Sequence, residues 1–167
     1  MDKRILRTKA ALKKSLLDLL RVKTINTISV KELCSNAGIN RSTFYAYYKS
    51  PEELLDSMQS DFIAELTAEA EKHRSPGDKT VLVRMLRKVK DNSCLMSTAL
   101  DRKVHFVSFL ESILYIPYDE CIKEWERTTE IKKETLEYIY TYMVHGAAGI
   151  LEAWLKSDMG ESPEELA

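Results

Sequence analysis

The sequence predicts an all-α protein in which a three-helix head is joined by a long fourth helix to a larger helical body. Apolar residues recur at the 3.6-residue spacing of amphipathic helices, and no window keeps the strict alternation of a half-buried strand. The 167 residues contain 44% apolar residues but only 5 Gly and 4 Pro. This composition is typical of a compact helical protein with a sizeable core.

The first helix is expected over residues 4–21. Its apolar side chains fall on one face, with lysines between them, at Ile5, Leu12, Leu16, Leu19 and Leu20. This pattern indicates an amphipathic helix that buries one face against the rest of the head.

The second helix is expected over residues 30–37, after a linker of mostly β-branched residues at 24–28. Ser29 stands three residues before Glu32. The serine hydroxyl can therefore accept a hydrogen bond from the Glu32 amide while the glutamate carboxylate reaches back to the cap. Gly38 supplies the left-handed residue that ends a helix without a steric penalty from a Cβ atom.

The third helix is short and is expected over residues 41–48, with Asn40 as its N-cap. Phe44 and Tyr48, four residues apart, form its inward face. Two short helices separated by a turn that contains Gly38 make a helix-turn-helix unit, and the second helix of such a unit fits a DNA major groove about 12 Å wide.

A strong start signal at residues 50–53, Ser-Pro-Glu-Glu, predicts a long fourth helix that runs toward His73 and is broken at 75–78. The body is expected to contain helices at 79–90, 92–100, 101–127 and 132–157, with a kink or split at Pro117. Another start signal occupies 162–165, so we expect a last helix either to be missing from the supplied chain or to have been lost.

Charge is distributed unevenly along the chain. Residues 1–50 hold eleven Lys or Arg against three Asp or Glu, a net charge of +8, so the remainder carries −9 within a total of −1. A positive head on a negative body is expected when only one end of a protein meets a polyanion. The alternative is a solvated basic face without a partner.

Several classes of site are disfavoured. Cys34, Cys94 and Cys121 are far apart and lack metal-ligand spacing, so we expect buried thiols, with a redox-sensing cysteine as the alternative. No catalytic or phosphate-loop motif occurs, and His105 alone makes neither an acid-base pair nor a metal site. We therefore expect no enzyme activity, cofactor or metal. No membrane span or signal core is apparent, which favours the cytoplasm.

The segment GINRSTFYAYYKSPEELL, residues 38–55, resembles the signature of the tetracycline-repressor (TetR) family, and ISVKELCSNAG, residues 28–38, is similar to that family's second helix. The resemblance is most specific over residues 7–66. It implies a DNA-binding domain at 1–50, a regulatory and dimerisation domain at 51–167, and a dimeric, sequence-specific transcription repressor released by a small-molecule effector.

The resemblance also implies contacts with double-stranded DNA. Base edges would be read by Lys31, Arg41 and Ser42. Phosphates would be held by Ser29, Thr43, Tyr45, Tyr47 and Lys49. Tyr45 has an alternative place among the core aromatics. Pro51 stands where the family usually has a basic residue, so Lys49 or the backbone amides of the fourth helix would take its place. This departure leaves open a co-activator that does not contact DNA directly.

In the body, the resemblance implies a homodimer formed through the last long helix, with an intrachain packing patch as the alternative. The expected interface residues are Tyr140, Met143, Gly146, Ala147, Ile150 and Trp154. A pocket for a small apolar or aromatic effector would be lined by Met85, Met96, His105, Phe106, Phe109, Tyr115, Tyr118 and Trp125, unless these are ordinary core. Two other classes compete with the regulator: a protein-interaction module, and a helical small-molecule carrier or enzyme.

Overall fold

The computed structural model describes residues 3–72, 79–101 and 118–167, and the regular elements of these residues are all helical. The prediction of an all-α fold is confirmed. The chain divides into two compact units, Met1–Phe62 and Ile63–Ala167, which we describe separately. Within the described residues, no helix has both the length and the apolar character needed to cross a membrane.

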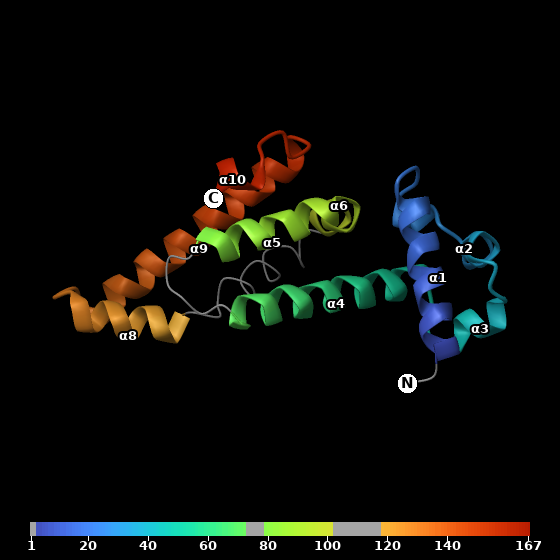
Figure 1. Ribbon diagram of the computed structural model, residues 1–167, viewed down its shortest axis with the longest axis horizontal. Coiled ribbons are helices and arrows are strands. Elements are labelled where there is room, and N and C mark those ends of the chain that lie inside the picture. Colours follow the sequence, from blue (N-terminus) through green and yellow to red (C-terminus); the bar gives the residue numbers. More distant parts are fainter. Residues whose placement is uncertain (1–2, 73–78, 102–117) are drawn as a thin grey trace. The chain divides into compact units, whose positions relative to one another are not determined.

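The first unit contains the elements of the head and the start of the long helix (Figure 1). They are α1 (Lys3–Leu20), the 3₁₀ turn η1 (Ile25–Thr27), α2 (Val30–Ala37), α3 (Arg41–Tyr45) and α4 (Pro51–Lys72). The core between them is apolar because Leu12, Leu16, Leu33 and Phe44 are fully buried. The buried Ser15 hydroxyl donates to the Leu33 carbonyl at 2.8 Å and ties α1 to α2.

The expected caps form around α2 and α3, with one correction. Ser29 Oγ accepts from the Glu32 amide at 3.2 Å, but the Glu32 carboxylate binds Lys23 Nζ at 2.5 Å instead of reaching back to the cap. The carboxylate binds the lysine in preference to the backbone amide of the cap, because a charged ammonium is a stronger hydrogen-bond donor than an amide. Gly38 ends α2 with φ 65°, and Asn40 caps α3 by accepting from the Ser42 amide.

The third helix is shorter than expected, since it ends at Tyr45 and not at Tyr48. The reason lies in the carbonyl of Phe44, which accepts from the amides of both Tyr47 and Tyr48 at 2.9 Å. Sharing one carbonyl between an i+3 and an i+4 donor tightens the chain into a closing turn. Phe44 and Tyr48 are nevertheless buried, as the inward stripe predicted.

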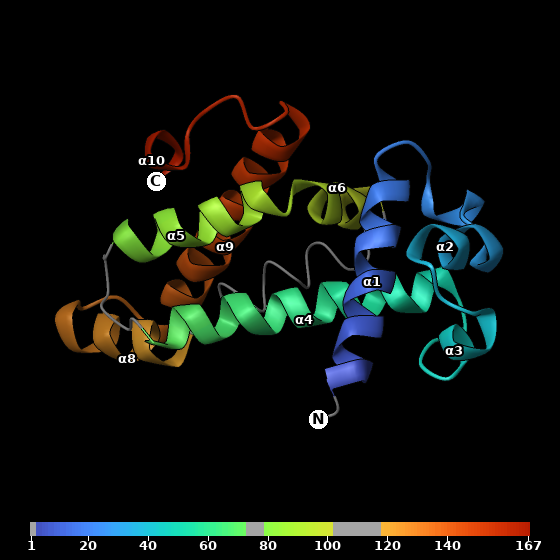
Figure 2. The same ribbon diagram turned by 45° about the vertical axis from the view of Figure 1, so that its right-hand side comes forward.

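The second unit contains the end of α4 and the helices of the body: α5 (Lys79–Asp91), α6 (Ser93–Asp101), α8 (Tyr118–Thr128), α9 (Lys133–Lys156) and α10 (Pro163–Leu166). Figure 2 shows α8 along the first half of α9. Ile122, Leu136 and Tyr140 form the core between these two helices, with Trp125 and Val144 packed against it.

The expected helix over 101–127 is observed in part. Asp101 is the last residue of α6 and does not start the next helix, whereas α8 covers the end of the expected range. The kink expected at Pro117 lies outside the described residues. The start signal at 162–165 does form a short helix, α10, with a complete capping box between Ser162 and Glu165.

Candidate nucleic-acid interface

The helix-turn-helix unit presents all three expected base-reading residues to solvent. Lys31 is exposed on α2, and Arg41 and Ser42 are exposed at the start of α3. The Asn40 cap determines where α3 begins, so it also determines where the Arg41 side chain leaves the helix. These three residues have the donors needed to read base edges in a major groove.

Tyr45 lies on the surface and is not a core aromatic, because 58% of it is exposed. Its ring packs edge-on against the buried Phe44, with ring centroids 5.6 Å apart. This contact with the core helps to hold the exposed Tyr45 ring in place. Thr43 is half-buried, and Ser29 is exposed beside the start of α2. Hydroxyls in such positions can donate to phosphate oxygens.

Tyr47 is held by a contact that sequence reasoning missed. Lys9 Nζ on α1 lies 5.5 Å from the centre of the Tyr47 ring and 5.9 Å from that of Tyr48. Both distances suit a cation–π interaction. The lysine therefore links α1 to the turn after α3 and stabilises the half-buried Tyr47 ring.

The start of α4 is less favourable for phosphate than the rest of the unit. Pro51 is buried, and Ser50 Oγ accepts from the Glu53 amide at 3.3 Å. The Glu53 carboxylate accepts from the Lys49 amide at 2.5 Å. A phosphate at this helix start would meet that carboxylate, so the exposed Lys49 side chain is better placed to hold it than the backbone amides are.

Cys34 lies inside the head, where burial raises the pKa of its thiol and the nearby Arg41 charge opposes this only in part. A raised pKa keeps the sulfur protonated and unreactive. Cys94 is half-buried, and the side chain of Cys121 lies outside the described residues. No group of three metal-ligating side chains gathers among the residues that the structure describes.

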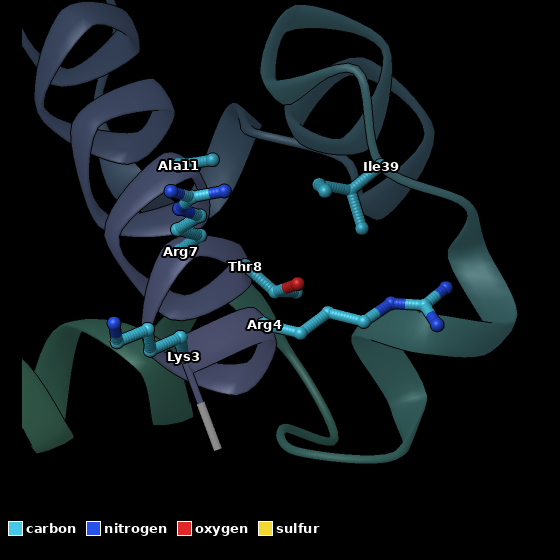
Figure 3. Close-up of a pocket in the computed structure, with 6 residues that line it drawn as sticks. All are labelled: Lys3, Arg4, Arg7, Thr8, Ala11 and Ile39. Carbon is cyan, nitrogen blue, oxygen red and sulfur yellow. The ribbon is translucent and has the colours of Figure 1, made fainter. Parts of the chain in front are cut away.

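A basic groove on the head is a second feature that sequence reasoning missed. Its volume is about 610 Å³, and it lies between α1 and the turn before α3 (Figure 3). It is lined by Lys3, Arg4, Arg7, Thr8, Ala11 and Ile39. The sequence does contain a signal for this groove, because Lys3 and Arg7 are one helical turn apart and therefore form a basic patch on one side of the first helix.

The expected dimer residues on α9 divide into two groups. Tyr140 and Trp154 are buried within their own chain, while Met143, Gly146, Ala147 and Ile150 are exposed. The exposed group continues into side chains that were not singled out in the sequence, with Tyr138 76% exposed and Tyr142 80% exposed. We call Tyr138, Ile139, Tyr142, Met143, Gly146 and Ile150 the open face of α9.

The expected effector residues also divide. Met85 is half-buried in α5, Met96 is buried in α6, and Trp125 packs against Tyr140 with ring centroids 6.5 Å apart. His105, Phe106, Phe109, Tyr115 and the side chain of Tyr118 lie outside the described residues.

Comparison with known proteins links both units to regulators. Residues 79–167, more than half of the chain, match the family model TetR_C_8, described as a transcriptional regulator C-terminal region. The uncharacterised HTH-type transcriptional regulator YxbF of Bacillus subtilis (strain 168) is 30% identical over 175 residues. This similarity spans the whole of this chain but only 44% of the length of YxbF.

Two solved structures resemble the fold. The dihydroxyacetone kinase operon activator DhaS has a TM-score of 0.64 and 25% identity, with 95% of this chain and 89% of that chain covered. A Clostridium perfringens protein assigned to the regulation of fatty acid metabolism has a TM-score of 0.62 and 14% identity, with 93% and 91% covered.

Proposed function

Because this chain belongs to the TetR family of transcriptional regulators, a family of regulators and not of enzymes, we propose that it binds double-stranded DNA in the cytoplasm as a homodimer. Residues 1–50 would bind DNA, and residues 51–167 would provide dimerisation and regulation. One observation carries the proposal. A capped helix-turn-helix exposes Lys31, Arg41 and Ser42 on a head with a net charge of +8.

The division of roles follows from chemistry and exposure. Arg41 and Lys31 are long exposed donors of the type that read guanine, with Ser42 beside them. Phosphate contacts are assigned to Ser29, Thr43, Tyr45, Tyr47 and Lys49. These residues determine the register of the protein on the duplex and carry little sequence information.

The open face of α9 supports the homodimer. Its apolar side chains lie on one side of a long helix, and Gly146 and Gly149 have no atom within 4 Å of where a Cβ would stand. Small residues allow a second helix to approach closely. A two-fold dimer would present two copies of α3 to two half-sites about 34–36 Å apart, one turn of DNA.

For regulation, we propose a repressor that is released when a small apolar or aromatic effector binds the body. The methionine and aromatic side chains of the expected pocket are the type that line such sites. An activator is the alternative to a repressor, because DhaS, one of the similar structures, is an operon activator.

A second candidate function is a co-activator that holds another protein and does not contact DNA. The observation that favours it is the start of α4, where the expected basic residue is replaced by the buried Pro51 and a carboxylate, Glu53, lies beside the Lys49 amide.

Selection of genomic fragments by the purified protein, followed by sequencing, tests the proposal. We expect enrichment of fragments that share one two-fold symmetric site. If no fragment is retained at low salt and one protein partner co-purifies in a stable complex, the co-activator replaces the DNA-binding regulator.

A further inference from the structure

We propose that the basic groove on the head holds a backbone phosphate of DNA that flanks the half-site read by α3. The groove is open, measures about 610 Å³, and lies between the first turns of α1 and the turn that precedes α3 (Figure 3). This inference rests on the proposed function and adds a contact site to it. The groove would extend the footprint of each head beyond the bases that Arg41 reaches.

The charged and hydroxyl groups of the lining suit a phosphate. Here Lys3, Arg4 and Arg7 supply three cations and Thr8 a hydroxyl, and the six lining residues include no carboxylate. Arginine matches phosphate particularly well, because its planar guanidinium donates two parallel hydrogen bonds.

The position of the groove connects it to the reading helix. Its far wall is Ile39, which lies in the turn between Gly38 and the Asn40 cap of α3. Figure 3 shows the Arg4 side chain extending from α1 across the groove toward α3. An anion in the groove would therefore lie beside the N-terminal end of α3, where Arg41 is the first residue of the helix. Phosphates next to a reading helix are the contacts that orient it on the duplex.

All three cations of this site, Lys3, Arg4 and Arg7, are exposed. The spacing of four residues between Lys3 and Arg7 places these two on one side of α1. Lys14 provides a matched control. It is also an exposed cation of α1, but it does not line the groove and lies about 10 Å further along the helix.

The experiment compares Arg7→Gln, Lys14→Gln and wild type on two duplexes that carry the same selected site. One duplex ends at the edge of the symmetric site, and the other extends by half a helical turn, about five base pairs, on each side. Dissociation constants are measured across a range of salt concentrations. Each variant removes one positive charge from α1, so only the location of that charge differs.

On the extended duplex we expect Arg7→Gln to bind several-fold more weakly than wild type and to lower the slope of log affinity against log salt by about 1.8, because each of the two heads of the dimer loses one phosphate contact. On the trimmed duplex it should match wild type, because the phosphate that it would hold is missing. Lys14→Gln should match wild type on both.

Equal affinities of Arg7→Gln and Lys14→Gln on both duplexes would overturn the proposed phosphate contact in the groove while leaving the DNA-binding function intact. A wild-type protein that retains neither duplex overturns both. Inorganic pyrophosphate, titrated calorimetrically, distinguishes the source of the phosphate. Saturable binding that Arg7→Gln abolishes, without any effect of duplex length, would assign the groove to a small phosphate ligand and overturn the DNA assignment.

Discussion

Arg41 and Tyr45 lie four residues apart on α3 and offer DNA different chemistry. Arg41 is exposed and has a guanidinium that can donate to both O6 and N7 of a guanine. Tyr45 offers a single hydroxyl on a ring supported by Phe44, which suits one phosphate oxygen. We therefore expect Arg41 to determine which sequence is preferred and Tyr45 to determine how strongly any sequence is bound.

Arg41→Ala should weaken binding to the selected site by about 1–3 kcal/mol and relax the preference at one base position, because one bidentate contact is lost. Tyr45→Phe should weaken all sequences alike. The measurement is binding to a set of duplexes that differ by single base pairs. A change of sequence preference in Tyr45→Phe, with none in Arg41→Ala, would reverse the proposed roles.

These residues could be predicted from the sequence because Phe44 and Tyr48 mark the buried side of the segment 41–48, which leaves Arg41 and Tyr45 to face outward. It could not reach the Lys9 contact with Tyr47, because that contact joins positions 38 residues apart through the packing of α1. The Glu53 carboxylate beside Lys49 was hidden for a related reason. A glutamate at the third helical position can accept from either of two neighbouring amides, and only the folded turn selects one.

At the scale of elements, α9 shows what a periodic sequence pattern can and cannot predict about burial. Periodicity identified the apolar side of the helix, but Tyr140 and Trp154 are buried in their own chain while Met143 and Ile150 are exposed. A pattern of 3.6 residues indicates which side chains are buried and not which chain buries them. That distinction depends on whether α8 and α6, the helices that pack against α9, cover a given turn.

Ile150→Glu tests the dimer that the open face would form. Ile150 is 58% exposed in the single chain, so a charge there should leave the monomer folded. In an apolar interface the same charge would be buried without a partner, and we expect the dimer dissociation constant to rise by more than about tenfold. Sedimentation velocity over a dilution series measures it.

Thr141→Glu is the control for this experiment. Thr141 is exposed on the same helix, nine residues from Ile150, which places it half a turn around the helix axis. It adds the same charge to the side away from the open face. If both variants dissociate equally, or if neither does, α9 is not the dimer interface.

The short helix α10 is fastened by carboxylates, which makes its docking sensitive to acid. A hydrogen bond from Arg87 lowers the pKa of Glu164, and hydrogen bonds within the Ser162 cap lower the pKa of Glu165. Groups with a lowered pKa stabilise the fold above their ordinary pKa and lose that contribution as pH falls through the lowered value. We therefore expect the docking of α10 to weaken as the pH falls below the ordinary pKa range of glutamate.

Trp154 reports this weakening, because its indole N–H donates to the Glu161 carbonyl at 3.0 Å and the residue is only 2% exposed. In a Trp125→Phe background, its emission should shift to the red on acidification. The double variant Glu164→Gln and Glu165→Gln should lack the step. An unchanged step in that variant would show that other groups govern the docking of α10.

At the scale of the whole molecule, the net charge of −1 gives no reason to expect attraction to DNA. The distribution of charge along the chain, in contrast, predicts that attraction. The head carries +8 and the remainder −9, so only the head of the chain favours a polyanion. Each phosphate that a Lys or Arg neutralises releases condensed counterions, and the affinity then depends on salt through the number of contacts and not through the net charge.

This dependence yields the last prediction. If a dimer makes about six to ten phosphate contacts, its affinity should fall by roughly 10³ to 10⁵ between 50 and 200 mM salt. Fluorescence anisotropy with the selected duplex measures the slope. Lys156→Gln, which removes a charge from the body at the end of α9, is the control and should leave the slope unchanged. A flat response in wild type would mean that the basic head does not meet phosphates, and it would favour a regulator that acts through a protein partner.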